Sequence, residues 1–470
     1  HKAKMETLQR TANRGSVSTG YDIDNSLKLE PDNSEFLSIT NTSDGSKRTA
    51  TYSFWLKRTE LEPSTWMQVA GLYNTGETVR FMFYQDHIML ENGWGGTQKR
   101  LTTNAVYRDT SSFYHFVVGI DTTQSTASNR VKLYVNGVQE TSFSTEQYPD
   151  QDFDLAIGRS GANYPWRYGA YDATYYGTAG YLAEAHYIDG TQYAASDFGE
   201  FDEDSGIWKP KEFTGNYGTQ GSYLNFSDAS NLGANSKGSD IDAVLTNITA
   251  ADQATDTPTN NFCTLNILYN YAYGNTITEG ATKIYGAANN WGGGKATFGL
   301  TSGKWYWEIK QLANGNTFMG LQTDGEDNIS SGNAQSQNTS VVFYTDGTLQ
   351  YSNGSESTTS ASNSIAANSI VGFALDLDSA TQTIKVYNNN SLVTAFGSSG
   401  TANLSTYNIA DKTVFPFVAL YDRTVNMNFG GYTVSSISSA ASDANGYGVF
   451  EYAPPSGYYA ICTKNLAEFG

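Results

Sequence analysis

Apolar and polar positions alternate along the first half of the chain with the period of two that is typical of β-strands. At residues 52–57, for example, Tyr52, Phe54 and Leu56 fall on one face. Further strands are predicted at residues 81–84, 87–90, 114–121, 131–135, 155–158 and 181–188. Gln85-Asp86 and Asn136-Gly137 are the turns of two hairpins, the second pair being the one preferred in type I′ turns. Short alternating strands between about residues 36 and 226 predict packed antiparallel sheets.

A second strand-rich block covers residues 262–450. Trp305, Trp307 and Ile309 share one face of a predicted strand. Other strands are predicted at residues 341–344, 349–351, 373–377, 383–387, 414–420 and 425–429, with Asp346-Gly347 as another hairpin turn. Pro416 has no amide hydrogen to donate to a neighbouring strand, so its strand is expected at a sheet edge or to begin there.

Three segments lie outside these blocks. Residues 1–30 hold a predicted short helix at 4–14, which is too short to be stable alone and is expected either to anchor the chain in a larger assembly or to remain a tail. Residues 227–261 are rich in Ser, Asp, Asn, Gly, Ala and Thr and indicate an interdomain linker. Residues 451–470 contain Pro454-Pro455 and are interpreted as an exit segment. The predicted fold is therefore all-β: two antiparallel β-sandwiches, at residues 31–226 and 262–450, joined by a polar linker.

Composition and charge narrow the classes of partner. The 470 residues include 33 Tyr, 23 Phe, 8 Trp and 46 Gly, which suits a β-rich chain. The formal net charge of −19 argues against binding to nucleic acid or to anionic membranes. No apolar run is long enough to span a bilayer, and no signal peptide is visible at the polar N-terminus. With only Cys263 and Cys462, the fold is not expected to depend on disulfides, although late pairing of the two stays open.

The first block resembles the concanavalin A-like and laminin-G-like family of jelly-roll sandwiches. The matching stretches occur in the family order, at residues 52–57 (Tyr-Ser-Phe-Trp-Leu-Lys), 114–118, 131–137, 155–158 and 180–184. The second block resembles a SPRY-type sandwich in residues 303–308 (Gly-Lys-Trp-Tyr-Trp-Glu), 372–378, 384–387, 415–418 and 428–430. These resemblances imply a jelly-roll lectin-like fold followed by a SPRY-like fold.

The tandem of both blocks, with residues 208–211, 256–261 and 453–459, resembles phage tail and appendage proteins. This resemblance implies a component of the virion, located on the tail or capsid surface. Its expected partners are other virion proteins and a host-surface glycan or protein, and a homotrimer is expected by analogy with phage fibres. A glycan-binding adhesin is the alternative function, and a polysaccharide-degrading enzyme is a weaker one.

No segment carries a convincing catalytic or metal-binding motif. The acidic run at residues 200–204 (Glu-Phe-Asp-Glu-Asp) lacks the alternating Glu, Asp, Glu of the sandwich glucanases and is interpreted as a solvated loop. His1, His87, His115 and His186 show no close metal-ligand spacing. Asp376 and Asp378 share a strand face and are interpreted as surface carboxylates, with a calcium site as the lesser alternative. We therefore predict no catalytic residue, no metal and no cofactor.

An aromatic stretch at residues 162–181 is the main candidate for ligand binding. Its rings can stack on sugars, and Arg167 and Asp172 can hydrogen-bond hydroxyl groups. The same composition suits adaptable protein-binding surfaces, and a third interpretation is that the rings pack on the sandwich or on a neighbouring subunit. The candidates are Tyr164, Trp166, Arg167, Tyr168, Tyr171, Asp172, Tyr175 and Tyr176, with Trp94 and Trp291 as secondary ones.

Overall fold

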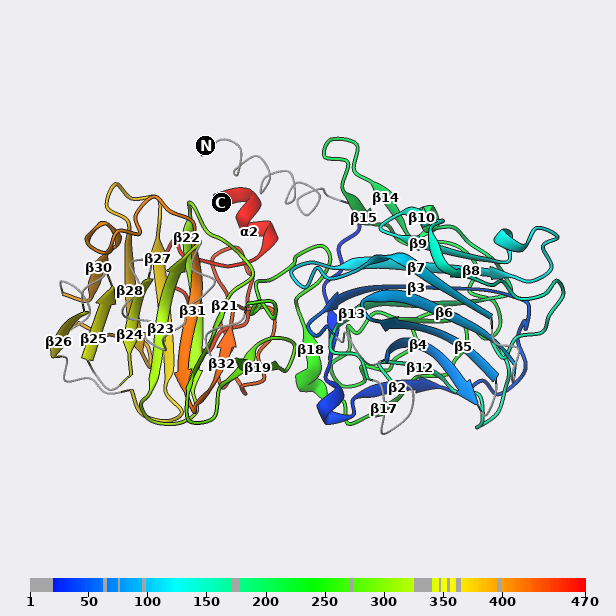
Figure 1. The fold of residues 1–470 in the computed structure, drawn as a ribbon, viewed down its shortest axis with the longest axis horizontal. Coiled ribbons are helices and arrows are strands. Elements are labelled where there is room, and N and C mark those ends of the chain that lie inside the picture. Colours follow the sequence, from blue (N-terminus) through cyan, green and yellow to red (C-terminus); the bar gives the residue numbers. More distant parts are fainter. Residues whose placement is uncertain are drawn as a thin grey trace. The chain divides into compact units, whose positions relative to one another are not determined.

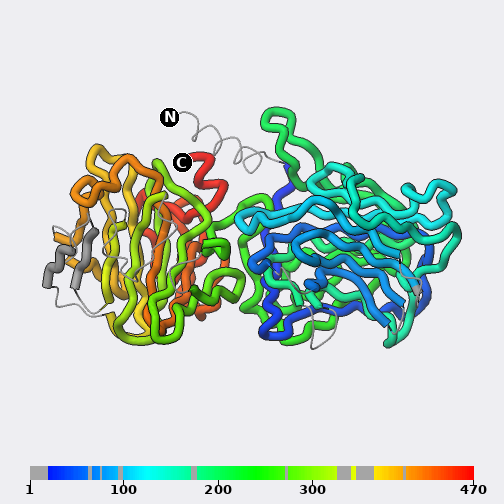
Figure 2. The backbone as a smooth tube through the Cα atoms, in the orientation of Figure 1, coloured from blue at the N-terminus to red at the C-terminus, as the bar shows by residue number. Residues whose placement is uncertain are grey.

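The computed structural model describes residues 20–61, 66–74, 77–94, 99–170, 177–269, 274–324, 340–345, 348–352, 356–360, 365–394 and 399–470. Within these ranges the chain forms two compact units that divide between Thr259 and Asn260 (Figure 1). Each unit is a pair of β-sheets packed face to face, and Figure 2 traces the backbone through both. The helix expected at residues 4–14 lies outside the described residues.

The first unit contains two sheets and one separate hairpin. The first sheet has the order β10-β9-β8-β3-β13-β1-β18, with β16 also pairing with β13: β10 (Val138–Glu140), β9 (Val131–Val135), β8 (Tyr114–Asp121), β3 (Thr49–Arg58), β13 (Gly180–Asp189), β1 (Ser26–Leu29), β18 (Gln253–Ala254), β16 (Ser222–Leu224). The second sheet has the order β11-β7-β6-β5-β4-β12-β2-β17: β11 (Phe143–Glu146), β7 (Lys99–Val106), β6 (His87–Trp94), β5 (Glu77–Tyr84), β4 (Trp66–Asn74), β12 (Trp166–Tyr168), β2 (Phe36–Ile39), β17 (Val244–Thr246). The hairpin is β14 (Gly199–Phe201) with β15 (Trp208–Pro210).

The core of the first sandwich follows from the alternation in the sequence. Phe54 of β3 packs edge-on against Phe81 of β5, with ring centroids 5.2 Å apart, and joins the two sheets. Both predicted hairpin turns are present. Gln85, Asp86 and Asn136 take positive φ angles of 51°, 62° and 47°, as type I′ turns require.

The linker expected at residues 227–261 is a wrong prediction. Residues up to Thr259 belong to the first sandwich, because β17 pairs with β2 and β18 pairs with β1. Two buried ion pairs also hold this segment. Lys57 Nζ lies 2.8 Å from an oxygen of Asp256, and Lys28 Nζ lies 2.9 Å from one of Asp252. Three apolar side chains of the segment, those of Leu232, Ala243 and Ile248, are buried in the core.

The second unit also contains two sheets. The first has the order β19-β20-β32-β22-β27-β28-β29, with β30 on β28 and β33 on β22: β19 (Asn275–Thr278), β20 (Lys283–Gly286), β32 (Thr424–Asn428), β22 (Lys304–Gln311), β27 (Ile370–Asp376), β28 (Thr383–Asn388), β29 (Ser391–Leu392), β30 (Thr401–Asn403), β33 (Tyr459–Ala460). The second has the order β21-β31-β23-β24-β25-β26: β21 (Trp291–Lys295), β31 (Val414–Tyr421), β23 (Thr317–Thr323), β24 (Ser340–Tyr344), β25 (Thr348–Ser352), β26 (Glu356–Ser360). Apart from the parallel β22–β33 pair, the ladders between the described strands are antiparallel.

The exit segment expected at residues 451–470 is instead part of the second sandwich. β33 pairs with β22, and the short helix α2 (Thr463–Phe469) follows it with Leu466 buried in the core. Cys263 and Cys462 are both buried in the thiol form, in two different apolar clusters. No disulfide therefore joins these two cysteines.

Two local predictions also differ from the structure. Residues 155–158 form a turn whose side chains are buried, rather than a strand. β31 is an internal strand between β21 and β23, and Pro416 is its third residue. Pro416 is tolerated there because it lies beyond the end of β21, and its carbonyl accepts the amide hydrogen of Ala296. The all-β fold of two sandwiches is confirmed. In the described ranges no helix is long and apolar enough to cross a membrane.

Candidate functional site

The structure places Trp166 and Tyr168 in the core of the first sandwich. The exposed fraction of Trp166 is 6%, and its ring centroid lies 5.1 Å from that of Tyr52. Tyr168 is fully buried, since it lies two residues further along β12 on the same face. The packing interpretation therefore applies to these two residues, which have no free ring face for a ligand.

The other candidates in the aromatic stretch have different surroundings. Tyr164 is half-buried, and the guanidinium of Arg159 lies over its ring at 5.3 Å. Arg167 lies on the opposite face of β12 from Trp166 and Tyr168, away from the core. Tyr171, Asp172, Tyr175 and Tyr176 lie outside the described residues, as does the side chain of Trp94.

Trp291, the candidate in the second sandwich, belongs to an aromatic cluster on the side of β21, β31, β23 and β24 that faces away from the main core. Its ring centroid lies 5.0 Å from that of Phe318, which in turn lies 4.5 Å from that of Tyr344. Trp291 and Tyr344 are half-buried, whereas Phe318 is buried. Packing on neighbouring strands therefore accounts for part of the ring of Trp291.

A charged row crosses the side of β12, β4, β5, β6 and β7 that faces away from the core, which we call the outer face. Strand register places Arg167, Gly71, Arg80, Glu91 and Arg100 side by side in that order. One oxygen of Glu91 accepts two hydrogen bonds from Arg80, and the other accepts two from Arg100 at 2.9 and 2.8 Å. Glu91 thereby fixes both guanidinium groups, and hydrogen bonds between two charged groups are of the strong kind.

Exposure differs along the charged row. Arg80 and Glu91 are buried, and the guanidinium of Arg80 also lies 5.2 Å from the ring of Tyr73. The side chain of Arg100 is 41% exposed, and Arg167 is half-buried. The row therefore presents Arg100 and Arg167 to solvent, with Arg80 and Glu91 as their support.

Two aromatic side chains lie at another part of the outer face. Trp66 of β4 pairs with Tyr84 of β5, and their ring centroids are 6.1 Å apart. Trp66 is 37% exposed, which makes it one of the few large exposed apolar side chains of the described chain. Sequence reasoning missed Trp66, Arg80, Glu91 and Arg100. The signal was present, because alternation along β5 and β6 places Arg80 and Glu91 opposite the apolar residues.

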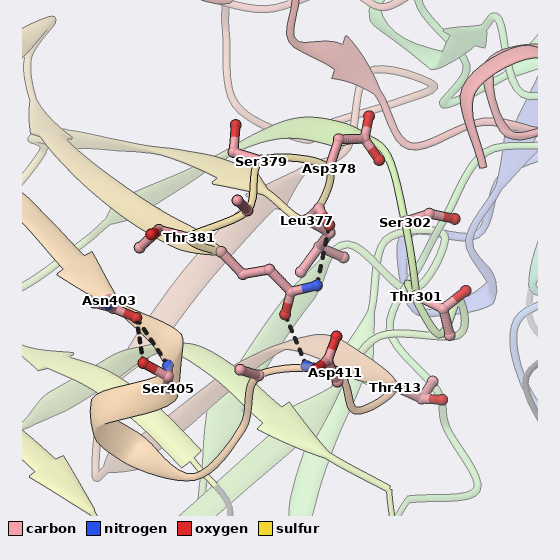
Figure 3. A pocket seen from close by; sticks show the side chains of 13 residues that line it. Thr301, Ser302, Leu377, Asp378, Ser379, Thr381, Asn403, Ser405, Asp411 and Thr413 are labelled. Carbon is pink, nitrogen blue, oxygen red and sulfur yellow. Dashed lines mark hydrogen bonds between the residues drawn. The ribbon is translucent and has the colours of Figure 1, made fainter.

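The second sandwich carries a hollow of 670 Å³, shown in Figure 3. Four segments line it: the loop before β22, the turn between β27 and β28, the residues around 403–405, and the loop before β31. Its floor includes the buried side chain of Leu377, and its walls are largely polar. The four segments are up to about a hundred residues apart in the sequence, so their residues form no local motif that could have indicated this site.

The structure disfavours nucleophilic catalysis by a serine–histidine pair that it brings together. Ser53 Oγ lies 2.8 Å from Nε2 of His115, but Nδ1 of His115 accepts the indole N–H of Trp208. An indole nitrogen only donates, so the imidazole proton is on Nε2, and that nitrogen cannot take a proton from Ser53. Burial also lowers the pKa of His115 to about 3. The pair is structural.

The acidic run at residues 200–204 begins in the strand of a hairpin rather than wholly in a loop. Asp202 accepts the amide of Ser205 at 2.9 Å and also its hydroxyl, and these bonds lower the pKa of Asp202 to about 2. Lys209 lies 3.4 Å from Glu200 and 3.3 Å from Asp202. A carboxyl group with so low a pKa is a poor general acid near neutral pH.

The described residues contain no group of three or more His, Cys, Asp and Glu side chains that could hold a metal ion. Asp376 is paired with Lys304 at 2.8 Å and accepts the hydroxyl of Ser379. Asp378 accepts the amide of Gly303 at 2.7 Å. Both carboxylates thus have structural partners that a calcium ion would have to replace.

Comparison with known proteins finds one family model that matches part of the first sandwich, and several solved structures of similar fold. Residues 31–175 match the family model described as "Concanavalin A-like lectin/glucanases superfamily". No curated protein matches the chain. The SPRY domain of human HERC1 is similar at 17% identity and a TM-score of 0.26, over 35% of this chain and 96% of that one. The PSpry domain of TRIM65 is similar at 13% identity and a TM-score of 0.25, over 36% and 89%.

A third solved structure, described as "a putative carbohydrate binding protein from Bacteroides ovatus", is similar at 11% identity and a TM-score of 0.31. The similarity covers 48% of this chain and 59% of that one. The chain thus combines a concanavalin A-like match at residues 31–175 with SPRY-like structural neighbours.

Proposed function

We propose that this protein binds carbohydrate without transforming it, and that it does so on the outer face of the first sandwich. The observation that carries the proposal is the charged row, with the exposed Trp66 on the same face. All five strands that form this face lie wholly within residues 31–175, the segment that matches a family of lectins and glucanases.

The chemistry of the outer face suits a polysaccharide. Trp66 and Tyr84 offer ring surface for the apolar face of a sugar. The guanidinium of Arg100 is held in place by Glu91, so little side-chain entropy is lost when it donates to a ligand. The two residues of the row that reach solvent, Arg167 and Arg100, are four strand spacings apart, about 19 Å, which favours an extended chain of sugars over a single ring.

The biological setting that we propose is the surface of a phage particle. This part of the proposal rests on the resemblance of residues 208–211, 256–261 and 453–459, together with the tandem of sandwiches, to phage tail and appendage proteins. There the chain contacts other virion proteins and recognises a host-surface glycan, as a homotrimer by analogy with phage fibres. The acidic net charge of −19 agrees with a partner other than nucleic acid.

A glycan array probed with the whole chain tests the binding proposal. Trp66→Ala and Arg100→Ala are each expected to weaken the strongest signal by more than about tenfold. Lys132→Ala, on β9 in the other sheet, is the matched control and is expected to bind as the wild type does. Equal binding by all three variants would contradict the proposed face. The absence of any glycan signal would contradict the function.

Immuno-gold electron microscopy of purified particles tests the setting. Label on tail or capsid projections supports a virion component. Particles without label, with the protein confined to the lysate, would contradict this part of the proposal and leave carbohydrate binding to be judged on the array alone.

A further inference from the structure

The hollow in the second sandwich is independent of the outer face of the first. It lies in residues 301–413, beyond the segment that matches the lectin-like family. Its volume of 670 Å³ falls within the range of about 300–1,000 Å³ that small-molecule sites occupy. Figure 3 shows Thr301 and Ser302 on one side of the hollow, and Asn403 and Ser405 on the opposite side.

Hydrogen bonds between the four lining segments hold the hollow open. The side chain of Gln382 donates to the carbonyl of Leu377 at 3.0 Å and accepts the amide of Asp411 at 2.7 Å. The backbone carbonyl of Gln382 accepts the amide hydrogen of Leu404 at 2.9 Å, and the carboxylate of Asp378 accepts that of Gly303. The walls are therefore preorganised, which lowers the entropic cost of binding a ligand.

The chemistry of the lining selects the ligand. Of the thirteen lining residues, all described in the structure, six carry a hydroxyl group, two a side-chain amide and two a carboxylate, and three are apolar. None of them is basic or aromatic. Because both charged groups, Asp378 and Asp411, are negative, an anionic ligand is repelled. The absence of rings means that recognition depends on hydrogen bonds rather than on stacking.

We propose that this hollow binds a short neutral saccharide. Sugar hydroxyl groups donate to the carboxylates of Asp378 and Asp411 and exchange hydrogen bonds with the hydroxyl and amide side chains of the walls. The inference rests on the proposed carbohydrate-binding function and adds to it a second site with its own specificity. The protein then engages a glycan through two separate domains, which raises its overall affinity for a polymer.

The test measures binding of a panel of neutral oligosaccharides to the whole chain by isothermal titration calorimetry. Ala380→Trp places a large side chain at the exposed rim of the hollow and is expected to weaken binding by more than about tenfold. Ala366→Trp, at an exposed turn of the same sandwich outside the hollow, is the matched control and keeps wild-type affinity. Asp411→Asn is expected to lower the affinity for the neutral oligosaccharide and to raise the affinity for its sulfated or carboxylated counterpart.

Each outcome separates this site from the outer face. Affinity lost with Ala380→Trp but kept with Trp66→Ala supports the hollow. Affinity lost only with Trp66→Ala overturns the hollow and leaves the proposed function standing. Anionic oligosaccharides that bind the hollow as tightly as neutral ones also overturn the inference. If no saccharide binds to either sandwich, both proposals fail.

Discussion

Nδ1 of His115 accepts a hydrogen bond of 2.9 Å from the indole N–H of Trp208. Because the indole nitrogen can only donate, this contact assigns the imidazole proton to Nε2, which donates to Ser53 Oγ at 2.8 Å. The imidazole is also stacked on Trp55, with ring centroids 4.5 Å apart. His115 is therefore neutral in the folded state, and protonating it would break the hydrogen bond from Trp208.

The stability of the first sandwich is expected to depend on pH through His115. Burial, with a smaller contribution from His186, lowers the pKa of His115 to about 3, whereas in the unfolded chain it is about 6.5. The unfolded state thus binds one more proton between these values. The stabilising contribution of neutral His115 is present above pH 6.5 and is lost as the pH falls towards 3, with a slope of about 1.4 kcal/mol per pH unit.

Urea unfolding of the first sandwich across pH 3–7 measures this effect. His115→Phe is expected to reduce the slope of the unfolding free energy against pH by one proton. Val118→Ala, a core substitution, is the control. It is expected to lower the free energy of unfolding at every pH and to leave the slope of that free energy against pH unchanged. A His115→Phe variant with the wild-type slope would show that the histidine titrates alike in both states.

Glu308 of β22 is expected to be essential for attaching the chain segment before β33. Its buried carboxylate accepts the amides of Glu451 and Tyr452, each at 2.9 Å, and the hydroxyl of Tyr306 at 3.0 Å. Burial nevertheless raises the pKa of Glu308. In Glu308→Gln an NH₂ group faces these donors, so the unfolding free energy of the second sandwich is expected to fall by about 1–3 kcal/mol.

Chemical denaturation followed by fluorescence of the second sandwich measures that loss. The control is Glu468→Gln, whose exposed side chain accepts a hydrogen bond from Asn445 and keeps an acceptor after substitution. It is expected to change the free energy by less than about 0.5 kcal/mol. If both variants match the wild type, the carboxylate of Glu308 is not what holds the segment.

The sequence was sufficient to predict strands where apolar residues recur at every second position. Residues 114–121 and 131–135 are examples, because Val118 and Leu133 pack into one core. The sequence was insufficient to predict the burial of charged side chains whose partners are distant in sequence. Asp252 and Asp256 look like solvated linker residues, yet Lys28 and Lys57 are more than 190 positions away in sequence and neutralise them in the interior.

Composition alone could not tell which face of β12 each residue of the aromatic stretch occupies. Trp166 and Tyr168 point to the core, whereas Arg167 between them points to the outer face. The partners of Arg167 in the charged row come from β4, β5, β6 and β7, and strand register alone brings them together.

The boundary between the two sandwiches gives a prediction about truncation. A fragment of residues 20–259 is expected to fold, because it keeps β17, β18 and the Lys57–Asp256 pair. A fragment of residues 20–226 leaves Lys57 buried without its carboxylate and is expected to be unfolded or aggregated. The cost of leaving a buried charge unpaired is about 3–5 kcal/mol, a large share of the stability of a domain.

Circular dichroism and thermal unfolding of the two fragments measure this difference. Asp256→Asn in residues 20–259 separates the ion pair from the rest of the deleted segment, and is expected to lower the melting temperature without abolishing the fold. Two fragments with the same melting temperature would show that residues 227–259 are a linker after all.

Trp66 in β4 and Trp166 in β12 lie in adjacent strands of one sheet. Replacing each by alanine is expected to affect different properties: the stability of the fold for Trp166, and the binding of sugar for Trp66. Trp166→Ala leaves a cavity among Tyr52, Tyr168 and Tyr187 and is expected to cost about 3–5 kcal/mol of stability. Trp66 is exposed on the outer face, so Trp66→Ala is expected to change stability by less than about 1 kcal/mol but to abolish the stacking surface for a sugar.

Measuring melting temperature and glycan affinity for both variants distinguishes packing from recognition. Trp166→Phe serves as the partner control, since it keeps most of the buried ring and is expected to restore part of the stability. If Trp166→Ala loses glycan affinity at a temperature where it remains folded, the ring contributes to the site despite its burial. If Trp66→Ala loses stability but no affinity, the outer face is a packing surface, and the site must lie elsewhere on the chain.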